Sequence, residues 1–105
     1  MKVNVDFDEE NDILYFYSSE SGVDYSIDYD DVVMDVSGNK VTGVEIMGAS
    51  EKFGLGRGVD FVEAYMDVKY GTDSMFVKVG FSLVSENARE GMLIQVPFGK
   101  GMSLG

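Results

Sequence analysis

Acidic side chains near the start of the chain recur at every second position, and these residues are Asp6, Asp8, Glu10 and Asp12. Alternating carboxylates are typical of a calcium-binding loop, in which alternate side-chain oxygens surround the ion. An EF-hand loop counted from Asp6 needs glycine at position 11 and a carboxylate at position 17, where this chain has Asn11 and Tyr17. The pattern therefore has two interpretations, a weak divalent-cation site and an acidic turn between strands, and the turn is the simpler one.

A second acidic group lies in residues 23–31, VDYSIDYDD, where aspartates alternate with tyrosines. Tyrosine is enriched in protein interfaces, and carboxylates attract a basic surface. The predicted partner-binding residues are Tyr25, Asp28, Tyr29, Asp30 and Asp31. The same acids, together with Asp35, would add to the cation site if the two groups converge. Tyr15 and Tyr17 have two interpretations, as part of the binding surface or of the core.

The absence of Cys and His limits the chemistry of this chain. It excludes disulfides, thiol nucleophiles, imidazole bases, Ser-His-Asp triads and zinc sites built from sulfur or imidazole. A carboxylate-based enzyme, such as a glycosidase with two acids at a set separation, stays open because a sequence supplies no separations. No cofactor is expected. The glycine-rich segment GLGRG, residues 54–58, lacks the Gly-Lys-Ser/Thr ending of a phosphate loop and is interpreted as a linker or long loop.

The chain carries 19 acidic and 8 basic residues, a formal net charge of −11. This charge disfavours nucleic acid and anionic membrane surfaces as partners, and it favours a basic protein or cations. Solubility is the alternative explanation of the acids. The chain begins in a strand pattern without a leader, and no apolar run approaches the ~18 residues that cross a membrane, so a cytoplasmic location is expected.

Hydrophobic periodicity predicts a β-rich chain, organised around a hairpin in residues 32–46 with a Gly38-Asn39 turn. Pairing from that turn places Val36 opposite Val41, Asp35 opposite Thr42 and Val33 opposite Val44, with both faces largely apolar and Gly43 marking a bulge or a close backbone approach. Period-two patterns predict further strands at residues 2–7, 23–31 and 75–83. A run that is apolar on both faces predicts one at 13–17, and a last strand is predicted at 92–96, where Pro97 stops it or marks an edge.

Three segments of the second half carry their own predictions. Residues 61–70 fit a strand or a helix, and their β-branched and aromatic content favours the strand. Residues 85–90 are the predicted short helix, with Ser85 as its N-cap and Gly91 ending it. Residues 99–105 are interpreted as a flexible tail.

Two stretches of the first half resemble a family known as domain of unknown function 2283. One is Phe7 to Phe16, an aromatic residue, an acidic turn, an aspartate and an apolar-tyrosine run; the other is Val33 to Ser50, with GVEI and Ala-Ser in the family's positions. The resemblance covers residues 1–53, and the chain departs from it at Phe7, where the family usually has tyrosine, and at Gly48. It implies a small β-rich domain, assigns no catalytic residues, and suggests an antitoxin-type partner of a small basic protein.

The sequence thus predicts an all-β or β-dominated single domain, residues 1–105, of about seven mainly antiparallel strands in a sandwich or partly open barrel with one short helix. Its parts are a family-like half (1–53), the glycine-rich loop (54–58), a second β half (59–98) and the tail. The expected function is that of a non-catalytic acidic interaction module that binds and inhibits a basic protein. A weak cation-binding or carboxylate-based enzyme is the alternative, and a homodimer is plausible because exposed sheet edges pair readily.

Overall fold

The computed structural model describes residues 1–18, 22–84 and 89–98. These residues form one antiparallel sheet in the strand order β3-β4-β5-β2-β1-β6-β7-β8. Its strands are β1 (Lys2–Asp8), β2 (Ile13–Tyr17), β3 (Tyr25–Tyr29), β4 (Val32–Ser37), β5 (Lys40–Met47), β6 (Phe61–Tyr70), β7 (Ser74–Leu83) and β8 (Arg89–Pro97). The helix of the described residues is α1 (Ala49–Phe53), between β5 and β6. The predicted β-dominated fold is therefore confirmed.

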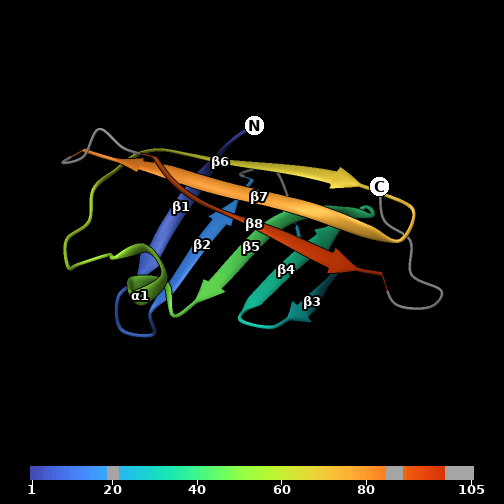
Figure 1. Ribbon diagram of the computed structural model, residues 1–105, viewed down its shortest axis with the longest axis horizontal. Helices are drawn as coiled ribbons and strands as arrows, with labels where there is room; N and C mark the ends of the chain where they lie inside the picture. Colours follow the sequence, from blue (N-terminus) through green and yellow to red (C-terminus); the bar gives the residue numbers. More distant parts are fainter. Residues whose placement is uncertain (19–21, 85–88, 99–105) are drawn as a thin grey trace.

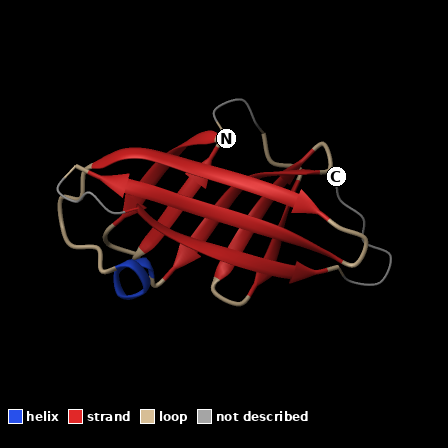
Figure 2. Cartoon of the chain, turned by 45° about the horizontal axis from the view of Figure 1, so that its top comes forward, coloured by secondary structure: helices blue, strands red, loops and turns tan. Residues whose placement is uncertain are grey.

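The sheet bends at β1 so that its two ends cover each other. Lys2 and Val3 pair with Tyr65 and Ala64 of β6, whereas the pairing of β1 with β2 begins at Asn4. Figure 1 shows β6–β8 crossing in front of β1–β5, and Figure 2 shows the same crossing from a second direction. The result is a half-barrel with β3 and β8 as its edge strands.

The inner face of β1–β5 consists of apolar rows that run across all five strands. Taken in the order β1, β2, β5, β4, β3, one row is Val5, Phe16, Val44, Met34 and Ile27, and the next is Phe7, Leu14, Ile46, Val32 and Tyr29. The three central strands supply the fully buried members of these rows. Side chains alternate between the two faces of a strand, so the residues between these rows all point outward.

A β-bulge changes the register that the sequence predicts for the β4–β5 hairpin. Val36 lies opposite Val41 as expected, but Asp35 lies opposite Gly43, which leaves Thr42 as the extra residue. The expected pairing of Asp35 with Thr42 is therefore wrong. A bulge opposes two residues of one strand to a single residue of the other, and this shifts every pair beyond it by one position.

The bulge also decides which face of the hairpin is buried. It brings Val44 and Ile46 to the same face as Val41, and all three are buried in the core. Val33 lies opposite Glu45 on the outer face, and not opposite Val44 as expected. The bulge that Gly43 was expected to mark is therefore present, but the register drawn from the turn did not include it. Without the bulge one apolar face looked like two, so the prediction that both faces of the hairpin are largely apolar is wrong.

Phe81 of β7 holds the two ends of the sheet together. Its ring is fully buried and stacks near Phe16 of β2, with ring centroids 6.5 Å apart. It also makes edge contacts with Phe53 of α1 and Phe61 of β6, at 5.4 and 5.3 Å. A second link comes from Tyr70, whose hydroxyl oxygen accepts a 2.9 Å hydrogen bond from the backbone N–H of Val41.

The helix forms where two segments distant in sequence meet. Gly48 and Gly54 flank α1, both with positive φ, which glycine adopts without strain. Asp12, in the β1–β2 turn, supplies the missing cap: its carboxylate accepts 2.8 Å hydrogen bonds from the backbone N–H and the hydroxyl of Ser50. This short helix is not long enough to cross a membrane, and the described residues contain no other helix that could.

The helix predicted for residues 85–90 falls mostly outside the described residues, and its last two residues belong to a strand. Residues 85–88 lie outside the described residues, as does the predicted tail, residues 99–105. Arg89 and Glu90 belong to β8, where they pair with Ser82 and Phe81 of β7. Pairing with a long neighbouring strand outweighs the weak local preference of so short a segment. Residues 61–70 form β6, so the strand interpretation of that segment is confirmed.

Replacement of Phe81 by alanine is expected to destabilise the fold by about 3–5 kcal/mol, because it removes a fully buried ring that three other aromatic rings contact. Phe76→Ala on the same strand is the matched control, since Phe76 is 38% exposed and is expected to lose no more than about 1 kcal/mol. Urea unfolding of both variants measures the difference. Equal losses would contradict the central role of Phe81.

Candidate functional site: an acidic face with tyrosines

Two neighbouring rows of side chains cross the outer face of β1–β5. In the order β1, β2, β5, β4, β3, the first row is Asp6, Tyr15, Glu45, Val33 and Asp28, and the second is Asn4, Tyr17, Gly43, Asp35 and Ser26. We call these residues the acidic face. It contains four carboxylates and two tyrosines, and neither Lys nor Arg.

The centre of the acidic face is a hydrogen-bonded group around Asp35. The carboxylate of Asp35 is 9% exposed and accepts hydrogen bonds from the hydroxyls of Tyr15, at 2.7 Å, and Ser26, at 2.9 Å. The Tyr15 side chain reaches Asp35 by lying across Gly43. A Cβ atom on Gly43 would come within 2.8 Å of the Tyr15 hydroxyl and 3.0 Å of the Asp35 carboxylate. Glycine at the bulge therefore makes this contact possible, which is the close approach that the sequence suggested.

Burial, followed by the hydrogen bond to Asp35 and the charge of that carboxylate, raises the pKa of the Tyr15 hydroxyl far above its ordinary value. The hydroxyl therefore keeps its proton and acts as a hydrogen-bond donor. A tyrosine that acts as a general base needs a lowered pKa, so that its hydroxyl can lose the proton. The geometry therefore favours a structural and binding role for Tyr15 over a catalytic one.

Tyr17 extends the group toward β1. Its ring stacks on that of Tyr15, with centroids 4.8 Å apart and planes 17° from parallel. The Tyr17 hydroxyl donates a 3.0 Å hydrogen bond to the Asp6 carboxylate, and this hydrogen bond is the main cause that raises the pKa of Tyr17. Two stacked rings thus lie between carboxylates on both sides, a surface that is apolar at its centre and negative at its rim.

Glu45 lies between Tyr15 and Val33 in the first row. Burial raises the pKa of its carboxyl, and the negative charge of Asp35 adds to this effect. No positive side chain stands in either row to offset these charges. A cation or a basic side chain placed over the face would relieve the repulsion, so the electrostatics favour a positively charged ligand.

The acidic character belongs to the first part of the chain. Residues 1–60 contain 14 of the acidic residues and 4 of the basic ones, a formal −10, whereas residues 61–105 contain 5 and 4, a formal −1. The charge of the protein is therefore concentrated on one end of the half-barrel. Acidic residues that served only solubility would not need to be concentrated in one part of the chain.

The carboxylates of the acidic face are spread across the five strands β1–β5. Cavities of about 260–400 Å³ lie elsewhere on the described residues, and these are lined by no residue of this face. Carboxylates that perform acid–base chemistry work in a pocket that excludes water and surrounds the substrate. Acids spread over a face favour binding.

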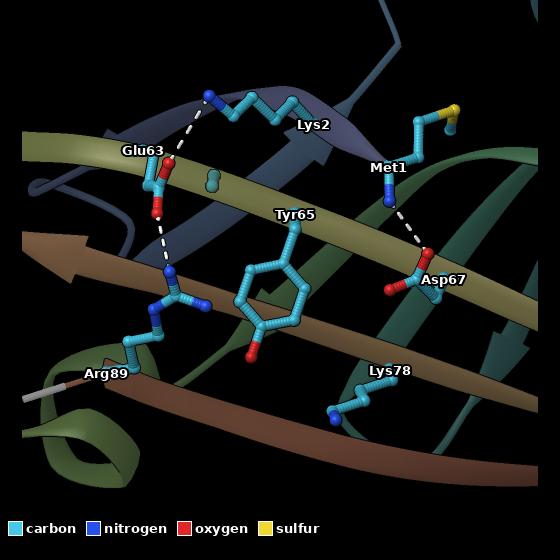
Figure 3. A pocket seen from close by; sticks show the side chains of 8 residues that line it. Met1, Lys2, Glu63, Tyr65, Asp67, Lys78 and Arg89 are labelled. Carbon is cyan, nitrogen blue, oxygen red and sulfur yellow. Dashed lines mark hydrogen bonds and ion pairs between the residues drawn. The ribbon is translucent and has the colours of Figure 1, made fainter.

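One of these cavities, of about 370 Å³, lies on the outer face of the second half (Figure 3). Tyr65 of β6 extends across β7 here and lies over Gly80, its partner in the register. A Cβ atom on Gly80 would be 2.3 Å from the ring, and one on Gly91 of β8 would be 3.5 Å from the hydroxyl. The two glycines therefore make room for the tyrosine, as Gly43 does for Tyr15.

Charged side chains at this cavity are largely paired with one another. Figure 3 shows Glu63 between Arg89 and Lys2, at 3.0 and 3.5 Å. Asp67 holds the amino group of Met1 at 2.8 Å. This mixed rim presents no region of a single charge sign, and we therefore assign the candidate site to the acidic face.

The five predicted partner-binding residues do not lie on one surface. Asp28 belongs to the acidic face, but Tyr25 and Tyr29 lie opposite Val36 and Val32, so they point to the inner face of edge strand β3. Asp30 and Asp31 form the β3–β4 turn, where Asp31 pairs with Lys52 at 3.1 Å. The tyrosines that stand beside the acids are Tyr15 and Tyr17. Side chains of a strand alternate between its two faces, so the sequence already indicated that Tyr25 and Tyr29 point to the face opposite Asp28.

The predicted cation ligands are engaged separately. Asp6 binds Tyr17, Asp8 binds the side chain and backbone of Asn11, and Asp12 binds Ser50. The hydrogen bonds from Asn11 lower the pKa of Asp8. Glu10 is exposed in the same turn. Within residues 1–18, 22–84 and 89–98, no group of three or more acidic side chains is arranged to hold a metal ion.

Residues 4–50 match the model of a family described as a protein of unknown function (DUF2283). The predicted resemblance of the first half is thereby confirmed. The matched segment contains every residue of the acidic face, together with Asp12 and Ser50, whose contact joins the two stretches that carry the resemblance.

Two curated relatives match part of this chain. A protein of Methanosarcina mazei named "Putative hypoxanthine phosphoribosyltransferase" is 34% identical over 68 residues, which cover 60% of this chain and 55% of that protein. An uncharacterized protein of Methanocaldococcus jannaschii is 39% identical over 56 residues, 52% of this chain and 48% of that protein. The chain thus spans about half the length of the curated relatives it matches. No solved structure matches it significantly.

Removal of the Tyr15 hydroxyl in Tyr15→Phe is expected to destabilise the fold by about 1–3 kcal/mol, because the nearly buried Asp35 carboxylate loses a donor. Tyr17→Phe removes the same group from an exposed hydrogen bond and is expected to cost less than about 1 kcal/mol. Chemical denaturation of the two variants gives the comparison. A loss in Tyr17→Phe as large as in Tyr15→Phe would argue against the Asp35 group.

Glu45→Gln is expected to raise the melting temperature at neutral pH and to lose this advantage as the pH falls. The folded-state pKa of Glu45 lies above its unfolded value, so the charged carboxylate opposes folding at pH values above both. As the pH falls through the folded-state pKa toward the unfolded value, the folded wild type takes up a proton first and the penalty disappears. Calorimetry at several pH values follows the difference.

Glu10→Gln is the control for this experiment, since it removes the same charge from an exposed turn. An equal gain in Glu10→Gln at neutral pH would assign the effect to the net charge of the chain instead of the position of Glu45.

Proposed function

We propose that this chain is a non-catalytic interaction module whose acidic face binds a positively charged surface of another protein. The observation that carries the proposal is the composition of the two rows: four carboxylates around two stacked tyrosines, with no basic residue among them. Interfaces combine apolar aromatic anchors with a polar rim, and this face has both. Its partner is expected to bring Lys or Arg side chains, with Arg able to stack on Tyr15 and Tyr17.

The rigidity of the face supports the same role. Tyr15 and Tyr17 are fixed by stacking and by hydrogen bonds to Asp35 and Asp6, so little side-chain entropy is lost when a partner binds. The strands beneath belong to the packed half-barrel. A preformed surface of this kind suits the inhibition of a small basic protein by covering its positive region, as an antitoxin-type partner does.

The name of the Methanosarcina mazei relative does not lead to a second candidate function. Transfer of a phosphoribosyl group requires binding of phosphate, and the two rows of the acidic face contain no basic side chain that would bind it directly. This chain also matches only about half of that protein. The proposal keeps the cytoplasmic location expected from the sequence.

The test is a comparison of two triple variants with the same net charge. Asp6→Asn, Asp28→Asn and Glu45→Gln neutralise the acidic face, while Asp35 is retained because it supports Tyr15. The control variant neutralises three exposed acids elsewhere: Glu10→Gln, Glu51→Gln and Asp60→Asn. Each form is expressed untagged in the source organism, purified gently at low salt, and weighed by native mass spectrometry.

The expected result is a complex with a basic protein for the wild type and for the control variant, and no complex for the acidic-face variant. The complex should also dissociate as the salt concentration rises, because exposed charges are screened. A wild type that carries no partner protein, or equal loss of the complex in both triple variants, would overturn the proposal.

A further inference from the structure

The two edge strands of the half-barrel differ in how they are protected from pairing. Edge strands expose unpaired backbone groups, and short length and charged side chains keep them from joining other chains. β3 has both protections: it spans five residues, it carries Asp28, and Asp24 and Asp30 flank it. β8 spans nine residues, and its segment 91–97, GMLIQVP, has no charged side chain. The charges Arg89 and Glu90 and the proline Pro97 stand at the two ends of β8, so its middle is less protected than β3.

The hydrogen bonding of β8 shows which of its backbone groups point outward. The N–H of Phe98 donates to the carbonyl of Asp73 at 2.8 Å, which continues the β7–β8 register beyond Pro97. In an antiparallel ladder every second residue makes both bonds to its neighbour, so Met92, Ile94 and Val96 bond to β7. Gly91, Leu93 and Gln95 turn their N–H and C=O groups toward the free edge. Pro97 is in the outward series as well, where its missing N–H breaks no bond to β7.

Side chains near this edge are apolar and exposed. Leu93 is 66% exposed, and Phe76 on the neighbouring strand is 38% exposed. Figure 1 shows β8 at the margin of the layer formed by β6–β8. This margin belongs to the part of the chain with a formal charge of only −1, so a second copy that approaches here meets little of the repulsion that a net charge of −11 would cause elsewhere.

We infer that β8 is a dimer interface that pairs in antiparallel fashion with β8 of a second copy. The sequence of the edge complements itself about a two-fold axis at Leu93: Leu93 lies opposite its own counterpart, and Gly91 lies opposite Gln95. Arg89 then lies opposite Pro97, whose missing N–H ends the ladder at both sides. The eight-stranded sheets of two copies join into one continuous sheet.

The proposed dimer leaves both acidic faces free, because these lie on the outer face of β1–β5, the side that β6–β8 do not cover. A dimeric module presents two binding faces to a partner that is itself repeated or dimeric, and it gains avidity without new contacts. The dimer and the acidic face respond to salt in opposite directions. Salt weakens binding of a basic protein, whereas it reduces the repulsion between two acidic copies and strengthens the dimer.

The test measures the mass of the full chain by size-exclusion chromatography with light scattering, from micromolar to millimolar concentration. The wild type is expected to dimerise, more tightly as salt rises. Leu93→Lys places two ammonium groups opposite each other on the axis and is expected to weaken the dimer at least tenfold. Val62→Lys is the matched control, because Val62 is 62% exposed on β6, away from the edge, and its variant should dimerise as the wild type does.

Hydrogen exchange of the wild type gives a second measurement that does not depend on the folding of any variant. The amides of Gly91, Leu93 and Gln95 are expected to exchange more slowly as the protein concentration rises. A monomer at all concentrations, fast exchange of these amides throughout, or a dimer that Leu93→Lys leaves intact would overturn the inference. Each of these outcomes leaves the acidic face untouched, since none of the altered residues belongs to it.

Discussion

The packing of one end of the sheet on the other, around Phe81, is the contact on which the rest of this structure depends. A single sheet of small strands has no core of its own, and it becomes stable only when its apolar face is covered. Here the bend at β1 lets β6–β8 cover β1–β5, and Phe16, Phe53 and Phe61 meet on the ring of Phe81. The apolar face of β1–β5 and the apolar face of β6–β8 are buried against each other in this contact. The opposite, outer face of β1–β5 is therefore left to solvent.

That outer face carries an unfavourable concentration of charge, and the structure shows how it is tolerated. Two tyrosine hydroxyls donate to Asp35 and Asp6, and Ser26 donates to Asp35. Glycine at position 43 gives Tyr15 the space to reach its acceptor. Burial, to which the charge of Asp35 adds, raises the pKa of Glu45. Acids kept close together at a cost to stability support the proposed binding role, since stability is commonly given up at functional sites.

Tyrosine over glycine occurs twice in this sheet, at Tyr15 over Gly43 and at Tyr65 over Gly80. In both places a bare glycine in a central strand would expose backbone, and the neighbouring ring covers it. The first pair supports a charged group, whereas the second lies among charges that largely neutralise one another. A tyrosine ring over a glycine therefore occurs on two different surfaces. Only the acidic face, which contains Tyr15 and Gly43, has charges of a single sign.

Sequence patterns alone determined the strands, since alternating apolar residues define a buried face for each strand wherever it lies in the sheet. They also determined the acidic character, the absence of thiol and imidazole chemistry, and the family resemblance of the first half.

The position of the helix and the register of the hairpin were decided by tertiary structure. Asp12 caps α1 from a distant turn, and the bulge at Thr42 reverses the faces of Val44 and Ile46. The cap leaves no local signal, because it depends on residues brought together by folding. Gly43 indicated a bulge, but the sequence did not say how the bulge shifts the register. The acidic face was also decided by tertiary structure. Its members are spread from Asn4 to Glu45 in the sequence, and only the strand order β3-β4-β5-β2-β1 places them in two adjoining rows.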